Sequence, residues 1–311
     1  MLIIILCFNY CFSSFSKVVD QERELQLTAS KIFLPEKFDM VTSGSSRINY
    51  GVDPDTIKLH LKNLRIYNCA MFGGAVNKEI LDYLENKKID WDAPGIKIVL
   101  IELSPRVLWN SLRKNRSYRS VIEKSPDEIS RLLNYSPEKR FSVHNLLLPM
   151  DRERWNLRKN KKKSSIAICH PETGWYEVIN NSSNTEKDIL KRLANAKKTS
   201  VITNRKDLYE INNSLHELLA KTREWNKRGV AVFGVEPPID RRIRELESSL
   251  SGYDTKKIHE MFKKAGGKVL KVSDDYKVVL GGSHLDSVEA KRFSKEVARQ
   301  IAVYINAEKR K

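Results

Sequence analysis

Five continuous apolar runs predict that this chain is built on buried β-strands. Apolar runs of this kind, which lack a polar residue at every second position, are typical of parallel strands buried on both faces. Helical patterns separate the runs. The alternation predicts an α/β fold, a three-layer sandwich with a central parallel sheet of about five strands. The runs are Phe38–Thr42, Leu64–Cys69, Ile96–Leu103, Val230–Val235 and Lys268–Val272.

The helices between these runs are marked by capping residues and by apolar stripes. Asp53 and Pro54 predict a helix start, because aspartate caps the first free N–H groups and proline fits the first turn. Residues Asn77 to Asn86 form a second helical pattern. Two longer stripes have helical spacing: Leu208, Ile211, Leu215, Leu218 and Leu219, and then Phe293, Val297, Ile301 and Ile305.

The segment from about residue 106 to 204 interrupts this rhythm. It is polar and helical in patches, and Arg152–Lys163 contains seven basic residues and one acidic residue. We expect a helical and basic insertion after the third strand, which forms a lid or an accessory subdomain. The basic run is either a solvated loop or an electrostatic contact for an anionic substrate or membrane.

The charge of the whole chain favours an anionic partner. The chain has 311 residues and a formal net charge of +17. Such an excess suits a phosphate-bearing polymer, an acidic glycan, a membrane surface or a nucleic acid. The alternative is that the basic residues only solvate exposed helices. Because no RNA- or DNA-binding motif is present, the sequence does not favour nucleic acid.

The first residues resemble a targeting segment. Met1–Phe8 is almost entirely apolar, and serines follow it. The run is too short to span a bilayer, and it lacks the basic start of a secretory signal. We expect residues 1–16 to be a signal peptide or a truncated membrane anchor, with a short buried strand as the alternative. The targeting interpretation predicts an extracytoplasmic protein, membrane-anchored or secreted.

The cysteines and histidines do not predict a metal site. Cys7 and Cys11 lie in the apolar first segment, and Cys69 and Cys169 are far apart in the sequence. Neither pair has the spacing of zinc ligands. The later two are expected as buried or free thiols, with a disulfide between them left open. No metal or cofactor is expected.

Two short motifs at opposite ends of the predicted fold carry the candidate chemistry. Gly44-Ser45-Ser46 follows the first strand, and Ser283-His284-Leu285 precedes the last helix. A serine becomes a nucleophile when a base takes its proton and backbone donors stabilise the oxyanion. This arrangement resembles the SGNH/GDSL hydrolase superfamily, in particular its envelope-associated members with Gly-Ser-Ser and Ser-His-Leu motifs. The resemblance covers roughly residues 34 to 307, within a predicted domain of residues 34–311.

The resemblance implies a flavodoxin-like SGNH fold and a set of roles. Ser46 takes the place of the nucleophile, and His284 takes the place of the base. The backbone N–H groups of Ser46 and Gly73 would form the oxyanion hole, with Gly74 as the register alternative. The asparagine that the family places after the third strand is absent, and Ser104 is the substitute donor considered there.

Two positions near the motifs leave alternatives open. The family places an aspartate three residues before the histidine, and this chain has Gly281 there. Asp274, Asp275 and Asp286 are the substitutes considered, and Gly281→Asp would restore the acid if the backbone φ there is not positive. Arg47 either anchors a substrate anion or forms a salt bridge across the sheet edge.

The resemblance therefore implies a serine esterase or acyltransferase that acts on an acylated, anionic cell-envelope polymer. The alternative is a catalytically degenerate binding or assembly protein of the envelope on the same fold, because losing the acid of a triad costs several orders of magnitude in rate. A membrane surface is a further candidate partner.

Overall fold

A central parallel sheet with helices on both faces organises the protein in a computed structural model. The structure describes residues 23–109, 116–134, 166–179, 186–199, 205–251, 254–279 and 281–308. All five predicted strands are present and belong to one sheet, so the expected α/β fold is confirmed. These strands are β1 (Met40–Ser43), β2 (Ile66–Asn68), β3 (Lys97–Glu102), β6 (Val230–Val235) and β7 (Lys268–Val269).

The order of the strands is β2-β1-β3-β6-β7, and every neighbouring pair is parallel. This is one of the two common orders of doubly wound sheets. β1 lies between β2 and β3, so the chain first builds the sheet to one side of β1 and then to the other. Ligands of such sheets bind at the carboxyl ends of the strands, beside this switch point.

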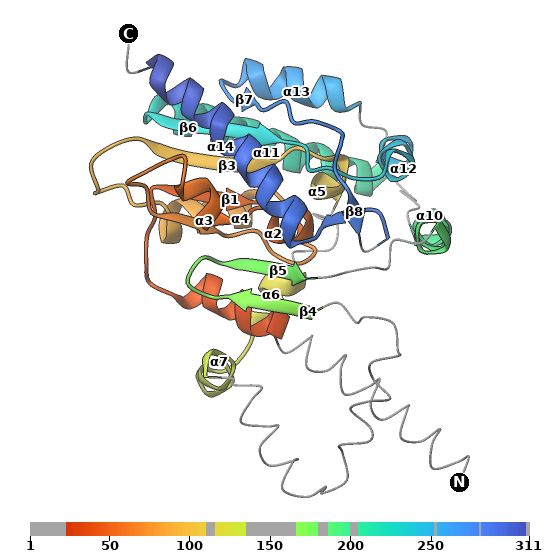
Figure 1. Ribbon diagram of the computed structural model, residues 1–311, viewed down its shortest axis with the longest axis horizontal. Helices are drawn as coiled ribbons and strands as arrows, with labels where there is room; N and C mark the ends of the chain where they lie inside the picture. Colours follow the sequence, from red (N-terminus) through yellow and green to blue (C-terminus); the bar gives the residue numbers. More distant parts are fainter. Residues whose placement is uncertain are drawn as a thin grey trace, which may run out of the picture.

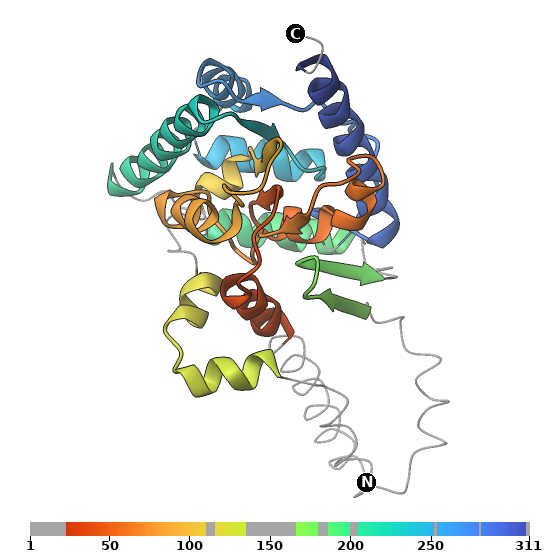
Figure 2. The same cartoon turned by 90° about the vertical axis from the view of Figure 1, so that its left-hand side faces the viewer.

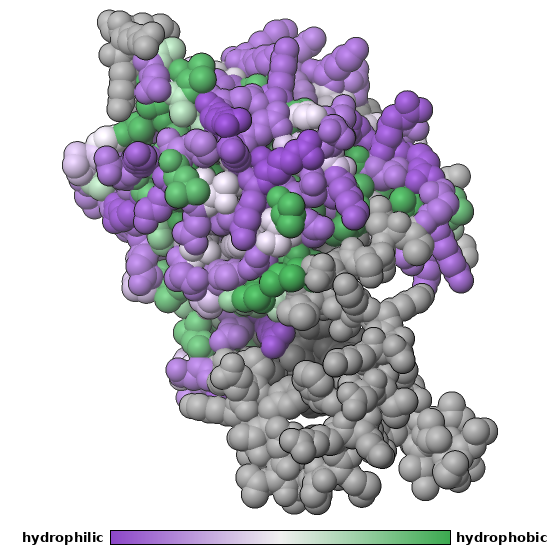
Figure 3. Space-filling model, viewed as in Figure 1, coloured by the Kyte–Doolittle hydropathy of each residue, from purple (hydrophilic) through white to green (hydrophobic). Residues whose placement is uncertain are grey.

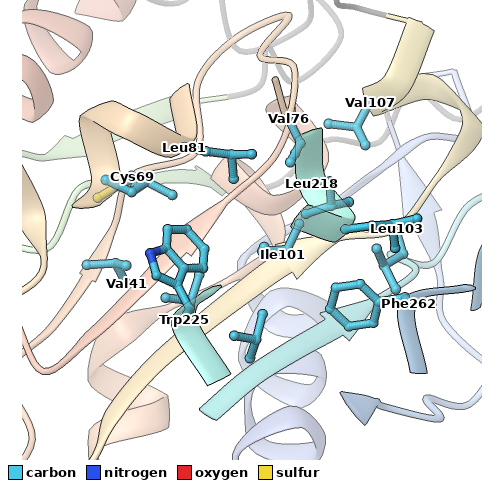
Figure 4. Close-up of a cluster of buried hydrophobic side chains, with 14 of the residues drawn as sticks. Val41, Cys69, Val76, Leu81, Ile101, Leu103, Val107, Leu218, Trp225 and Phe262 are labelled. Atoms are coloured by element: carbon cyan, nitrogen blue, oxygen red, sulfur yellow. The ribbon is translucent and has the colours of Figure 1, made fainter. Parts of the chain in front are cut away.

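Side chains alternate along each strand and divide the hydrophobic core into two layers. On one face, Val41 and Val99 pack with α4 (Lys78–Tyr83), α11 (Arg205–Lys227) and α13 (Thr255–Lys264), around the fully buried Trp225. Figure 4 shows this cluster, with Trp225 beneath Leu81 and Cys69.

On the other face, Met40 and Ile98 pack against α2 (Ser46–Gly51), α3 (Pro54–Lys58) and α14 (Ser287–Glu308). Figure 1 shows α14 in front of the sheet and α11 behind it. The predicted helices are therefore present on both faces. The cap at Asp53 is as expected, because its side chain accepts from Asp55 N–H. Asn77, where the second predicted helical pattern begins, is the N-cap of α4.

The remaining elements connect the layers or extend from them. A short π-helical turn, η1 (Leu84–Lys88), continues α4, and α12 (Arg241–Ser251) follows β6. A two-stranded hairpin of β8 (Val278–Val279) and β9 (His284–Leu285) leads directly into α14. The chain between β3 and β6 contains α5 (Pro105–Trp109), α6 (Arg116–Ile122), α7 (Pro126–Leu133), β4 (Ile166–His170), β5 (Trp175–Ile179) and α10 (Glu186–Thr199) before α11.

The predicted insertion contains one element that its polar pattern does not reveal. β4 and β5 pair as an antiparallel hairpin. The hairpin packs on the main fold, because Thr173 O accepts from Asn68 N–H and Trp175 Nε1–H donates to Tyr50 O. Figures 1 and 2 both show the hairpin next to the helical residues 23–33, and Arg23 donates to Ala167 O in the hairpin. Residues 23–33 precede the predicted domain start at 34, yet their side chains are part of the packed fold.

The face of the described residues that Figure 3 shows is largely hydrophilic, with scattered apolar side chains. The predicted targeting segment at residues 1–16 and the basic run Arg152–Lys163 lie outside the described residues. Within the described part of the chain, no helix is both long and apolar enough to cross a bilayer.

Candidate functional site

Ser46 occupies the first turn after β1, at the carboxyl edge of the sheet and at the switch point. Ser45 is the N-cap of α2, because its hydroxyl accepts a hydrogen bond from Arg47 N–H. Ser46 is therefore the first residue of α2. The backbone at Gly44 passes close to Glu102, and a Cβ at this position would lie 2.7 Å from the Cβ of Glu102. Only glycine therefore fits here. The local sequence thus turns the chain sharply and leaves the Ser46 hydroxyl at the edge of the sheet.

Glu102, at the end of β3, holds this turn in place. Its carboxylate accepts from the backbone N–H and the hydroxyl of Ser45 at 2.7 and 2.8 Å. Ser104 Oγ donates to the other carboxylate oxygen at 2.6 Å. Glu102 is fully buried, as is expected of a carboxylate whose oxygens are all engaged. The hydroxyl of Ser104 is therefore committed to Glu102, which corrects its expected role as an oxyanion donor.

The structure brings Ser46 and His284 together, as the sequence analysis expects. Ser46 Oγ lies 2.9 Å from His284 Nε2, although 238 positions separate the two residues in the chain. His284 is held there by the β8–β9 hairpin and by the start of α14. A hydroxyl this close to an imidazole nitrogen can pass its proton to that nitrogen when the nitrogen is unprotonated.

The other ring nitrogen of His284 contacts a serine. Ser283 Oγ lies 2.9 Å from His284 Nδ1, and Ser283 is fully buried. Gly281, where the family has its acid, adopts a φ of 68°. This is the left-handed region, which disfavours other residues.

The three aspartates considered as substitutes have other contacts. Asp274 pairs with Arg244, and Asp275 pairs with Arg292. Asp286 Oδ1 accepts from a backbone N–H in the first turn of α14. Because each carboxylate has these partners, none of the described contacts supports it as the acid of a triad.

Gly73 lies in an exposed turn after β2. The turn is closed by Gly74 N–H, which donates to Met71 O, and Gly73 has a φ of 61°. Met71 N–H in turn donates to Gly44 O and ties this turn to the one that carries Ser46. Since the turn itself uses the N–H of Gly74, Gly73 is the better of the two register alternatives for an oxyanion donor.

Lys31, in the helical residues 23–33, forms hydrogen bonds with both α2 and the segment that leads into the Gly73 turn. Its ammonium donates to Asn49 Oδ1 on α2 at 2.6 Å and to the backbone oxygen of Ala70, just before the Gly73 turn. Lys31 is fully buried, and this burial lowers its pKa to about 7, against the opposing influence of Cys69 and Cys169. Lys31 could not be identified from the sequence, because an isolated lysine in a helix carries no sequence signal.

Arg47 does not reach the surface, which settles the alternative left open above. Its guanidinium makes two hydrogen bonds to the carboxylate of Glu247 on α12, at 3.0 and 2.6 Å. The side chains are only 3% and 6% exposed. Burial opposes the charge of Arg47, but the attraction of Glu247 raises its pKa above the ordinary value. Arg47 is therefore a buried cation in a salt bridge, as the alternative expected, and these contacts give no support to its predicted role as a substrate anchor.

An aromatic cluster lies beside the Ser46–His284 pair. The ring of Tyr50, one turn after Ser46 on α2, is 4.6 Å from the ring of His284. Phe72 and Tyr176 pack on Tyr50 with centroid distances of 5.6 and 5.0 Å. Tyr176 comes from the hairpin inside the insertion, so the sequence order hides its proximity to the site. The cluster fixes the plane of the imidazole and borders it with apolar surface.

Cys69 and Cys169 are free thiols, so the disulfide left open is not formed. Burial raises the pKa of Cys69 to about 11, which keeps this thiol protonated and unreactive. Among the residues that the structure describes, no group of three or more histidine, cysteine, aspartate and glutamate side chains is placed to hold a metal ion.

Comparisons with protein-family models, with curated proteins and with solved structures each found no match to this chain.

Proposed function

We propose that this protein is an SGNH-like serine esterase or acyltransferase that acts on an acylated, anionic cell-envelope polymer. The observation that carries the proposal is the 2.9 Å contact between Ser46 Oγ and His284 Nε2. Its position supports the proposal as well, because the pair stands at the edge of a doubly wound sheet where ligands bind. We propose in addition that the α/β fold of this protein is the SGNH variant of that fold.

In the proposed reaction Ser46 Oγ attacks the ester carbonyl while its proton moves to His284 Nε2. The carbonyl oxygen becomes an oxyanion, which the N–H groups of Ser46 and Gly73 stabilise. When the tetrahedral intermediate collapses, Nε2 returns the proton to the leaving alcohol, and an acyl group remains on Ser46. Water or a sugar hydroxyl then attacks this acyl-enzyme, with His284 again as the base. Water gives an esterase, and a sugar hydroxyl gives an acyltransferase.

Charge and the first segment support the substrate class. A net charge of +17 favours a polymer that carries phosphate or carboxylate groups, such as an acylated glycan or a teichoic-acid-type polymer. The apolar residues 1–16 support an extracytoplasmic location, secreted or membrane-anchored. The same charge would hold the protein near an anionic membrane surface.

A fluorophosphonate probe tests the proposal directly, because it forms a covalent bond only with an activated serine. We expect the full-length protein to be labelled, with the label on Ser46, and we expect no labelling of Ser46→Ala or His284→Gln. His216→Gln is the matched control, since this histidine is exposed on α11. Failure of the folded wild type to react, or equal labelling of Ser46→Ala, contradicts the proposal.

The alternative is a binding or assembly protein of the envelope that retains the fold without the chemistry. The observation that favours it is Gly281, whose left-handed backbone stands where the family has an acid. This alternative predicts no labelling and no hydrolysis of p-nitrophenyl acetate above buffer. It also predicts that the wild type and Ser46→Ala co-sediment equally with an acylated, anionic envelope polymer. Unequal binding by the two proteins contradicts it.

A further inference from the structure

Both ring nitrogens of His284 face a serine hydroxyl. Nε2 is 2.9 Å from Ser46 Oγ, and Nδ1 is 2.9 Å from Ser283 Oγ. Ser283 is fully buried, so bulk water does not compete for its hydroxyl. Its backbone is fixed as well, because Ser283 N–H donates to Val279 O within the β8–β9 turn.

A hydroxyl can donate or accept, and the direction decides whether His284 can be a base. If Ser283 accepts a hydrogen bond from Nδ1–H, then Nε2 is unprotonated and can take the proton of Ser46. If Ser283 donates to Nδ1, then Nε2 carries the proton and donates to Ser46, which leaves no base for the nucleophile. The partner of Nδ1 therefore selects between an active and an inactive tautomer.

We propose that Ser283 is a positioning residue that accepts the hydrogen bond of Nδ1–H and holds His284 with Nε2 ready to receive the Ser46 proton. This inference rests on the proposed function. During attack the Ser46 proton passes to Nε2, the Nδ1–H bond to Ser283 is kept, and the imidazolium later gives the Nε2 proton to the leaving alcohol. Ser283 itself neither gains nor loses a proton.

The geometry of the turn explains why a serine takes this position. Gly281 and Gly282 have φ angles of 68° and 78°, so the two residues before Ser283 form a left-handed turn that favours glycine. A Cβ on Gly282 would lie 2.9 Å from the Cβ of Asp240. The turn thus places Ser283 at Nδ1 of His284. Gly281, three positions before the histidine, does not take that place.

A neutral hydroxyl stabilises the imidazolium less than a carboxylate does, because it carries no opposite charge. The expected contribution of Ser283 is that of one neutral hydrogen bond. We expect Ser283→Ala to lower the rate of fluorophosphonate labelling of Ser46 about 10-fold, since the bond strengthens as charge develops on the ring. Ser283→Cys keeps a side chain of similar size but offers a weaker hydrogen-bond acceptor. We expect its labelling rate to lie between those of the wild type and Ser283→Ala.

The test combines the rate of fluorophosphonate labelling with the tautomer of His284. ¹⁵N NMR of full-length protein labelled at histidine reports which ring nitrogen carries the proton, and His284→Gln identifies the signal. We expect Nδ1–H in the wild type and a mixture of tautomers in Ser283→Ala. Ser294→Ala is the matched control, because Ser294 is also a fully buried serine with side-chain hydrogen bonds but contacts Gly51 and Asp53 instead.

The outcomes separate this inference from the proposed function. An Nε2-protonated wild type, or an unchanged tautomer and rate in folded Ser283→Ala, overturns the role of Ser283. If the wild type is not labelled at all, the proposed function fails, and the NMR tautomer still decides whether Ser283 positions the ring. If Ser283→Ala does not fold, the same two measurements on Ser283→Cys decide the question, with an unchanged rate and tautomer again overturning it.

Discussion

Three charged residues lie buried around the turn that carries Ser46: Lys31, Arg47 and Glu102, none more than 3% exposed. A charge can stay in the interior only when its polar atoms are engaged, because desolvation costs several kcal/mol per ion. Each of the three links α2 or the turn before it to another part of the fold. Lys31 reaches the Gly73 turn, Arg47 reaches α12, and Glu102 comes from β3. Together they fix the position of the turn that carries Ser46.

The pair of Arg47 and Glu247 makes a prediction about stability. We expect Arg47→Met or Glu247→Gln alone to lower the free energy of unfolding by about 3–5 kcal/mol, because each leaves a buried charge without its partner. The double variant should lose less than the sum of the two. Urea unfolding in a double-mutant cycle measures this coupling. The exposed pair of Arg241 and Glu245 is the control, and its coupling should be below about 0.5 kcal/mol.

Lys31 makes a prediction about pH. Burial lowers its pKa from the model-peptide value of 10.5 to about 7, so between these values the unfolded chain binds more protons at Lys31 than the folded chain does. Stability therefore rises with pH across this window. Below about pH 7 the penalty for burying the charged lysine is fully present, and above about pH 10.5 it is absent.

The measurement compares the wild type with Lys31→Met, in which this dependence is removed. From pH 7 to pH 9 we expect the wild type to gain about 2 kcal/mol of unfolding free energy relative to the variant. All other titrating groups are shared, so they cancel in the difference. A difference between the two proteins that stays constant from pH 7 to pH 9 would show that Lys31 does not titrate in this window.

At the scale of elements, the turn between β8 and β9 decides which residue meets His284. An aspartate at position 281 would have to adopt the left-handed backbone of Gly281, which costs about 1–2 kcal/mol. We therefore expect Gly281→Asp to lower the free energy of unfolding by about this amount and to give no gain in labelling of Ser46. This revises the expectation from sequence, which depends on an ordinary φ at that position.

Gly282→Ala is the companion variant for this turn. It should be the more destabilising of the two, because a Cβ at Gly282 also clashes with the Cβ of Asp240. Urea unfolding and fluorophosphonate labelling are the two measurements. A Gly281→Asp protein that labels faster than the wild type would show that the turn accommodates a carboxylate acceptor for His284.

In the molecule as a whole, the β4–β5 hairpin contacts both of the helices that flank the site. Trp175 Nε1–H donates to Tyr50 O on α2 at 2.9 Å, and Glu177 accepts from Ser287 in the first turn of α14. The hairpin thus contacts both the helix that begins at Ser46 and the helix that follows His284. We infer that the hairpin holds α2 and α14 in fixed positions relative to each other.

Trp175→Phe tests this connection, because it keeps an aromatic ring and removes one hydrogen bond. We expect a loss of about 1 kcal/mol in unfolding free energy, together with slower labelling of Ser46. Trp91→Phe is the control, since Trp91 Nε1–H also donates to a backbone carbonyl, that of Glu85, on an element remote from the site. Equal labelling rates for the two variants would argue against a role of the hairpin in the site.

The elements of the main fold and the motifs at the two ends of the site follow from local patterns in the sequence. All five strands could be predicted because buried parallel strands are short runs rich in apolar residues, which is a local property. The predicted capping residue Asp53 likewise acts on an N–H group only two positions away. Ser46 and His284 were paired through the resemblance of their motifs to those of SGNH enzymes, and each motif borders an element that the sequence predicts.

Only the tertiary structure decided which side chains surround that pair. The partner of Arg47 is 200 positions away, and Tyr176 comes from a hairpin within a polar segment. The role of the turn before His284 depends on the φ angles of two glycines, which a Gly-Gly sequence permits but does not impose. Long-range ion pairs, aromatic contacts and turn handedness depend on distances that exist only after folding, whereas strand and cap signals act between neighbours in the chain.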